Sequence, residues 1–149
     1  MITVQRLEKT AVICRRIREL RSSIETAYNT YHSPSFDRSY RKSTGHVSDP
    51  VVNAVNYLQD LHSQLAECLD YMCQFENDLS QIDDNEIIAI IRCHYILGDT
   101  WSDTNWKMYG KRDHSAIRKK LIRYLEREVN KDGQTETSSG EDQTIHAGI

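Results

Sequence analysis

The residues that could do chemistry are concentrated in one basic segment near the C-terminus. Residues 107–131 carry 9 Lys/Arg against 3 Asp/Glu, a net charge of +6, and an apolar residue recurs there at every fourth position. This pattern predicts an amphipathic helix with a buried apolar face and a cationic outer face. A cationic face can bind a polyanion such as the phosphate backbone of DNA, or it can simply keep a surface helix in water. The apolar positions are Ile117, Leu121, Leu125 and Val129.

Short polar side chains stand at the beginning of this helix. In a helix that binds duplex DNA, side chains of the first turn reach base edges, and cations further along contact phosphates. Alternatively, Asp113, His114 and Ser115 are only the cap of the helix. We expect base contacts from Asp113, His114, Ser115, Arg118 and Lys119, and phosphate contacts from Lys107, Lys111, Arg112, Lys120, Arg123 and Arg127.

No other group of residues in the sequence predicts catalysis or a cofactor. The four cysteines occur singly, without a C-x-x-C pair, which argues against a zinc site and against disulfides. His62 and His94 have no second imidazole or carboxylate at a ligand spacing. Trp101 and Trp106 are interpreted as packing residues. The sequence therefore predicts neither an enzyme nor a protein that holds a metal or another cofactor.

Length and composition limit the class of protein. The chain has 149 residues, 38% of them hydrophobic, with only 6 Gly and 2 Pro, which suits one compact domain or a small domain with a helical arm. Its densest apolar run, residues 87–91, is far too short to span a membrane. The first residues lack the basic and then apolar pattern of a signal peptide. We expect a soluble cytoplasmic protein without a membrane partner.

The net charge of −3 conceals alternating blocks. Residues 1–48 carry 9 basic against 4 acidic side chains, and residues 49–106 carry 1 against 11. Residues 132–149 carry 4 acidic side chains and no Lys or Arg. A polyanion would be repelled by the acidic blocks, so the basic segment at 107–131 is where it would bind.

A regular heptad pattern precedes the basic segment. Apolar residues recur at alternating steps of three and four and predict a helix over about 49–82, capped by Ser48 or Asp49, with Pro50 in its first turn. Such a seam requires a partner helix. The partner is either an earlier helix of the same chain or a second subunit, which would make the protein a homo-oligomer through the 51–82 seam. Its members are Val51, Ala54, Leu58, Leu61, Leu65, Cys68, Met72, Phe75, Leu79 and Ile82.

The earlier helix is predicted over about 3–31, followed by a basic, Ser-rich loop over 32–48. If it is the partner, the two helices form an antiparallel hairpin. Its apolar stripe consists of Leu7, Ala11, Cys14, Ile17, Leu20, Ile24, Tyr28 and Tyr31.

Three shorter helices are predicted after the seam. The first runs over 85–97, with Asp83 or Asp84 as its cap and Gly98 at its end. Thr100 and Asp103 have the spacing of a capping box that opens a second helix reaching about residue 109. The third is the basic helix, from Asp113 to about residue 129. This layout predicts a helix-turn-helix module.

The pattern over 84–129 resembles region four of bacterial sigma factors and the phage-encoded regulators that share it. An apolar-rich helix ends in Tyr95-x-x-Gly98, Thr100-Trp101 opens a short helix, and the basic helix follows. The resemblance implies a helix-turn-helix fold that binds duplex DNA, with RNA polymerase as a further partner. A small residue is usual in the middle of the first motif helix, where this chain has Asn105 or Trp106, and the connection to the basic helix is longer than usual.

The stretch Gly-Lys-Arg-Asp-His-Ser-Ala-Ile at 110–117 is similar to the DNA-binding signature of the bacterial replication initiator, although no ATP-binding P-loop accompanies it. In that family the matching Arg, Asp, His and Ser/Thr positions contact DNA. The residues implied here are Arg112, Asp113, His114 and Ser115.

We therefore expect an all-α protein with a helical arm at 1–82, a helix-turn-helix module at 83–130 and a disordered acidic tail at 131–149. The expected function is that of a phage-type transcription regulator that binds specific duplex DNA in the bacterial cytoplasm. One alternative is a small terminase-like component of DNA packaging, whose arm would build a ring. The other is a coiled-coil adaptor that does not bind DNA.

Overall fold

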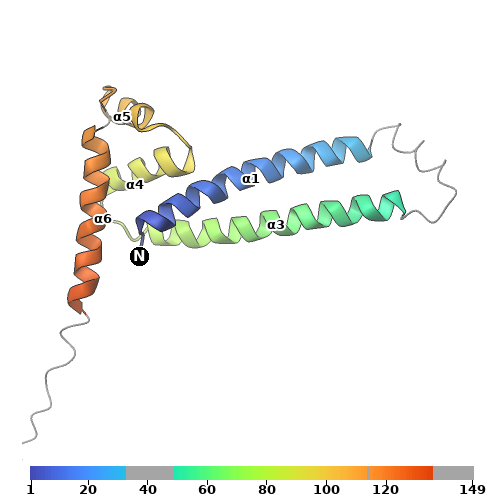
Figure 1. Ribbon diagram of the computed structural model, residues 1–149, viewed down its shortest axis with the longest axis horizontal. Coiled ribbons are helices and arrows are strands. Elements are labelled where there is room, and N and C mark those ends of the chain that lie inside the picture. The colour runs from blue at the N-terminus through green and yellow to red at the C-terminus, as the bar shows by residue number, and fades with distance from the viewer. Residues whose placement is uncertain (33–48, 114, 136–149) are drawn as a thin grey trace, which may run out of the picture. The chain divides into compact units, whose positions relative to one another are not determined.

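The structure is a computed structural model that describes residues 1–32, 49–113 and 115–135. These residues contain helices and no strand, which confirms the all-α fold class. The expected loop after His32, the residue His114 and the part of the expected tail beyond residue 135 lie outside the described residues. In chain order the elements are α1 (Val4–Tyr31), α3 (Pro50–Leu79), α4 (Asn85–Ile91), η1 (Arg92–Ile96), α5 (Trp101–Tyr109) and α6 (Ser115–Thr135) (Figure 1).

The chain forms two compact units. One comprises Glu8–Gln81 and is called the hairpin unit below; the other joins Met1–Leu7 to the chain from Ile82 onward and is called the C-terminal unit. The structure thus groups the first seven residues with the C-terminal unit, although the sequence analysis placed them in the arm. None of the described helices combines the length and the apolar character that crossing a membrane would need.

In the hairpin unit, α1 and α3 lie side by side and antiparallel (Figure 1). Thr10 Oγ1 and Tyr71 Oη are 3.1 Å apart, and the Arg16 guanidinium donates to Gln64 Oε1 at 2.6 Å. The heptad seam of α3 therefore packs against a helix of the same chain. A homo-oligomer that used the 51–82 seam would have to displace α1. The core consists of Ile17, Leu20, Ala27, Leu61 and Cys68, with Ile13, Ile24, Tyr31, Leu58, Leu65 and Met72 packed against it.

For two residues, the prediction that they belong to the buried stripes of α1 and α3 is wrong. Val51 is 45% exposed, because it stands in the first turn of α3. Tyr28 is 56% exposed and stacks on His32, while its neighbour Ala27 is buried. The apolar stripe runs through residues 24, 27 and 31, which are three and then four positions apart, as in a heptad pattern. Tyr28 lies outside this stripe.

The caps of α3 and α4 follow the sequence prediction. Asp49 accepts a hydrogen bond from Val51 N at 3.0 Å, and Pro50 occupies the first turn of α3. Asp84 Oδ1 accepts from Glu86 N at 2.9 Å and from Ile87 N at 3.3 Å. These bonds satisfy backbone donors that the first turn of a helix leaves without a partner.

The helix expected over 85–97 changes its winding in the middle. Residues 85–91 are α-helical, and 92–96 form the π-helix η1, in which Leu97 N donates to Arg92 O at 2.9 Å, five residues earlier. Gly98, with a φ of 80°, follows. An apolar periodicity cannot reveal this wider turn, because the buried positions of the segment, Ile87, Ile90 and Ile91, all precede it.

In the C-terminal unit, α6 packs against both α4 and α5 (Figure 1). Ile117, Leu121 and Leu125 are buried, as predicted. Val129 is 52% exposed, so the predicted fourth anchor is wrong. The helix also continues to Thr135, and residues 131–135, expected in a disordered tail, are helical.

Candidate nucleic-acid interface

The outer face of α6 presents the cations that the sequence analysis singled out. Arg118, Lys119 and Arg123 are exposed and form no ion pair with a described residue. Arg127 is exposed too, and its Nε donates to Arg123 O at 3.3 Å. Because the opposite face is packed against α4 and α5, these side chains can point only away from the unit. They form a cationic surface on a fixed helix.

Three other predicted phosphate contacts already have carboxylate partners. Lys120 is half-buried and forms an ion pair with Glu86 of α4. Lys107 Nζ lies 2.5 Å from Asp99 Oδ2, and this hydrogen bond raises the pKa of Lys107. The Arg112 guanidinium lies 3.8 Å from Asp103 Oδ1. The ion pairs of Lys120 and Lys107 connect neighbouring elements of the unit, and that of Arg112 is long and exposed. The exposed cations of α6 have no such partner among the described residues.

The first turn of α6 is capped by its own side chains. Asp113 Oδ1 accepts hydrogen bonds from the backbone N–H of Ser115 at 3.1 Å and from its hydroxyl at 3.0 Å. This is the same contact that Asp49 makes at the start of α3. Of the two interpretations of these residues, the geometry supports the cap for Asp113 and Ser115. His114, which the sequence analysis placed with them, lies outside the described residues.

A side chain of α5 forms a hydrogen bond with the backbone of the connection between α5 and α6. Helix α5 begins at the Thr100 cap, whose hydroxyl accepts from Asp103 N at 3.1 Å, and it ends at Gly110 with a φ of 69°. The amide of Asn105, only 4% exposed, donates to Lys111 O at 2.6 Å. The sequence had placed Asn105 or Trp106 where related motifs carry a small residue. Asn105 is the buried one, and it bonds to the turn.

A histidine and a tryptophan fix the other end of α5. The rings of His94 and Trp101 stack with centroids 3.7 Å apart and planes 17° apart. His94 Nδ1 lies 2.8 Å from Asp99 O and donates to it, because a carbonyl oxygen can only accept. Burial lowers the pKa of His94, and the charge of Arg118 lowers it further, against the opposing effects of Asp99. Sequence reasoning missed this contact because nothing in the pattern indicates the π-helix that carries His94.

Two exposed aromatic residues were also missed. Trp106, interpreted from the sequence as a packing residue, is 53% exposed, and Tyr109, one helical turn later, is 45% exposed. The Arg112 guanidinium lies 5.4 Å from the centroid of the Trp106 ring. Once Thr104 and Asn105 are known to be buried, helical periodicity places Trp106 away from the buried face. The sequence alone gives no reason for a helix to bury Thr and Asn instead of Trp.

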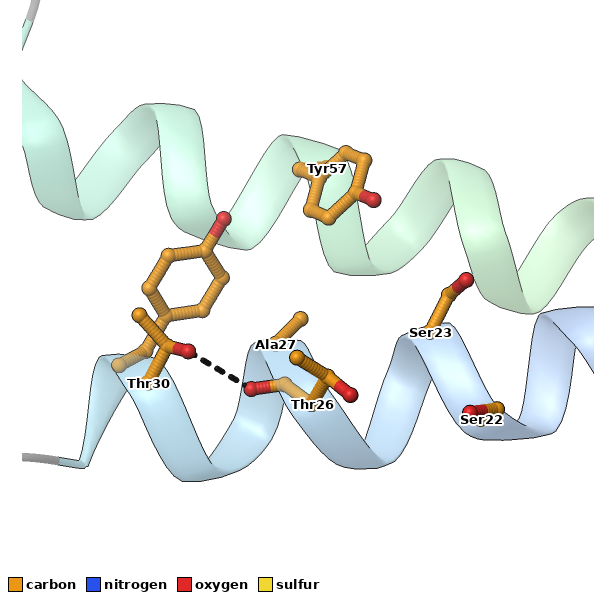
Figure 2. A pocket seen from close by; sticks show the side chains of 7 residues that line it. Ser22, Ser23, Thr26, Ala27, Thr30 and Tyr57 are labelled. Carbon is orange, nitrogen blue, oxygen red and sulfur yellow. Dashed lines mark hydrogen bonds between the residues drawn. The ribbon is translucent and has the colours of Figure 1, made fainter.

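The hairpin unit contains a pocket of a different chemical character (Figure 2). It has a volume of about 320 Å³ and lies between the end of α1 and Tyr57 of α3. Its lining, as far as the structure describes it, consists of hydroxyl-bearing side chains and one alanine, without a charged side chain. The lining residues are Ser22, Ser23, Thr26, Ala27, Thr30, Tyr31 and Tyr57.

The described residues do not gather three or more His, Cys, Asp or Glu side chains into a group that could hold a metal ion. The four cysteines are all unpaired thiols. In comparisons with known proteins, no family model, no curated protein and no solved structure matches this chain.

Proposed function

We propose that the C-terminal unit binds duplex DNA through α6, and that the protein regulates transcription by doing so. The observation that carries the proposal is the division of α6 into two faces. Ile117, Leu121 and Leu125 attach one face to α4 and α5, and the other presents Arg118, Lys119 and Arg123. A helix that is already folded against its unit can enter a major groove without losing further conformational entropy on binding. The resemblance to sigma factor region four supports the same assignment, with RNA polymerase as a second partner in the cytoplasm.

The contacts within the C-terminal unit change which residues we assign to bases and phosphates. Asp113 and Ser115 cap the helix, which leaves Lys119 and Arg118, one turn further along, as the proposed base-contacting side chains. Lys111, Arg123 and Arg127 remain as phosphate contacts. Lys107 and Lys120 are assigned to positioning the helices, because each forms a close ion pair with a carboxylate. Arg112, whose guanidinium lies 3.8 Å from Asp103 Oδ1, is not assigned to the duplex.

The salt dependence of DNA binding tests this proposal. The three cations assigned to phosphates, Lys111, Arg123 and Arg127, form no ion pair with a described residue and would release counterions from about three phosphates. The slope of log affinity against log salt concentration should then be about −3, not the steeper value of about −5 that six contacts and no internal pairing would give. An electrophoretic shift titration with duplex DNA at several salt concentrations measures it.

Two double variants distinguish DNA binding through α6 from a nonspecific attraction of DNA to any positive charge of the protein. Arg123→Ala combined with Arg127→Ala should flatten the slope by about 1.8. Arg15→Ala combined with Arg21→Ala removes the same charge from exposed positions on α1 and should leave the slope unchanged. The proposal fails if no duplex is retarded at low salt, or if both pairs of substitutions weaken binding equally.

A further inference from the structure

The turn between α5 and α6 carries an exposed group of aromatic and basic side chains. Trp106 is 53% exposed and Tyr109 is 45% exposed, on one face of α5. Lys111 and Arg112 follow directly, and both are exposed. We call these four residues the aromatic corner. An indole ring usually buries most of its surface, so a half-exposed Trp beside an exposed Tyr marks a surface suited to binding.

The backbone carbonyls of the two basic residues in the aromatic corner accept hydrogen bonds from side chains of α5. Asn105 Nδ2 donates to Lys111 O at 2.6 Å, and the Ser102 hydroxyl donates to Arg112 O at 3.3 Å. The Arg112 guanidinium lies 5.4 Å from the Trp106 ring centroid, within the range of a cation–π contact. Lys111 forms no ion pair with a described residue. The aromatic rings of Trp106 and Tyr109 therefore lie beside two cations on a turn whose backbone is hydrogen-bonded to α5.

Asp103 is a carboxylate beside this surface. Its Oδ1 lies 3.8 Å from Arg112, at the edge of ion-pair range. At exposed positions such a pair contributes little, so a ligand phosphate can compete for Arg112. Asp103 should repel a polyanionic ligand, which supplies a substitution expected to act in the opposite direction from the others.

We propose that the aromatic corner binds unpaired bases of single-stranded nucleic acid, with a base stacked on Trp106 and the backbone phosphates at Lys111 and Arg112. Sequence-tolerant binding of single strands combines these two elements, an aromatic face for the base and cations for the backbone. An acidic protein surface would use the cations but has no systematic need for an exposed indole. Three of the four corner residues lie outside the set assigned to the duplex, and the fourth, Lys111, stands at the boundary between the corner and the duplex-binding face of α6. The protein would therefore bind a duplex next to an unpaired segment.

Tryptophan fluorescence gives a direct test. The chain has 2 Trp residues, and Trp101 is packed against His94. Titration of the full chain with a short oligothymidylate should quench the emission of Trp106, since a base stacks on its ring. Trp106→Phe keeps a ring that can stack, so it should retain most of the affinity and lose the quenching.

Affinity measurements with matched variants complete the test. Trp106→Ala should weaken binding of the oligothymidylate about tenfold, as removal of one base–aromatic stack does. Tyr28→Ala removes an aromatic ring of similar exposure from the hairpin unit and should have no effect. Asp103→Asn should strengthen binding. A duplex with a single-stranded extension should bind more tightly than the same duplex without it, and Trp106→Ala should abolish this difference.

Each contrary outcome has a distinct meaning. If the duplex binds but the oligothymidylate does not, the aromatic corner proposal is overturned while the proposed function stands. If the oligothymidylate binds with no loss in Trp106→Ala, the single strand uses other residues and the proposal is again overturned. If a polyglutamate peptide competes as well as the oligonucleotide and also quenches Trp106, the corner recognises acidic chains in general and the assignment to nucleic acid is wrong.

Discussion

At the scale of single residues, internal partners decide which cations can serve a ligand. Lys107, Arg112 and Lys120 each face a carboxylate of the C-terminal unit, and Arg118, Lys119 and Arg123 do not face one among the described residues. Partly exposed ion pairs of this kind contribute at most about 1 kcal/mol to folding. Their effect is mainly on orientation: Lys120 joins α6 to α4, Lys107 joins α5 to the turn before it, and Arg112 lies near Asp103 of α5.

His94 supplies a prediction at the same scale. Its pKa is lowered mainly by burial, so between that pKa and the ordinary value of 6.5 the unfolded chain binds more protons than the folded one. The free energy of unfolding should therefore be greatest above about pH 6.5 and fall as the pH drops through this window. Urea unfolding at about pH 7.5 and about pH 5.5 measures the difference.

The matched variant for this prediction is His94→Gln, which removes the titrating group. Whatever its own stability, the difference between the two pH values should be smaller in this variant than in the wild type. An equal difference in both proteins would mean that other groups cause the pH dependence.

At the scale of elements, the helical hairpin depends on one apolar seam. Leu61 and Cys68 are buried, and Leu65, one turn from each of them, packs against the same cluster. The hydrogen bonds that join the two helices, such as Thr10 to Tyr71 and Arg16 to Gln64, are partly or fully exposed and add little beside this burial. The physical cause of the hairpin is therefore the burial of two complementary stripes.

Two leucines on α3 test this dependence. Leu65→Asp should lower the free energy of unfolding by about 3 kcal/mol, because it places an unpaired charge against the core cluster. Leu69→Asp, at a position that is 39% exposed four residues later, should change it by less than about 1 kcal/mol. Thermal and urea unfolding of both variants compare the two positions. If both variants melt like the wild type, the seam does not stabilise the hairpin.

At the scale of the whole molecule, charge is segregated along the chain. Residues 107–131 carry a net charge of +6, while residues 49–106 have 1 basic against 11 acidic side chains. A polyanion is therefore attracted to one part of the protein and repelled by another. Over distances beyond about 10 Å this repulsion is screened at about 0.1 M salt, so it acts most strongly at low ionic strength.

The acidic residues after α6 give a prediction at this scale. Removing residues 136–149 takes away Glu136, Glu141 and Asp142, and should strengthen duplex binding a few-fold at low salt, with convergence toward the wild type as salt increases. Full-length protein with these three residues changed to Gln, Gln and Asn should show the same gain. A gain in the truncated protein alone would mean that charge is not the cause.

Local periodicity and cap chemistry by themselves determined most of the elements of this protein. The α3 seam, the caps at Asp49, Asp84, Thr100 and Asp113, and the buried face of α6 all depend on residues a few positions apart. Such interactions are encoded within one or two helical turns. The candidate basic residues could be named for the same reason, because charge is a property of the sequence.

Only the tertiary structure decided how these residues are used. The seam could have joined two chains, and its burial against α1 depends on contacts between residues 48 to 61 positions apart. The π-helix at 92–96 and the His94–Trp101 stack depend on the docking of α5. Burial of Asn105 beneath the turn, which turns Trp106 outward, and the pairing of Lys120 with Glu86 depend on which helices meet. These contacts have no local signature, because each is made between elements whose approach the packing of the whole unit determines.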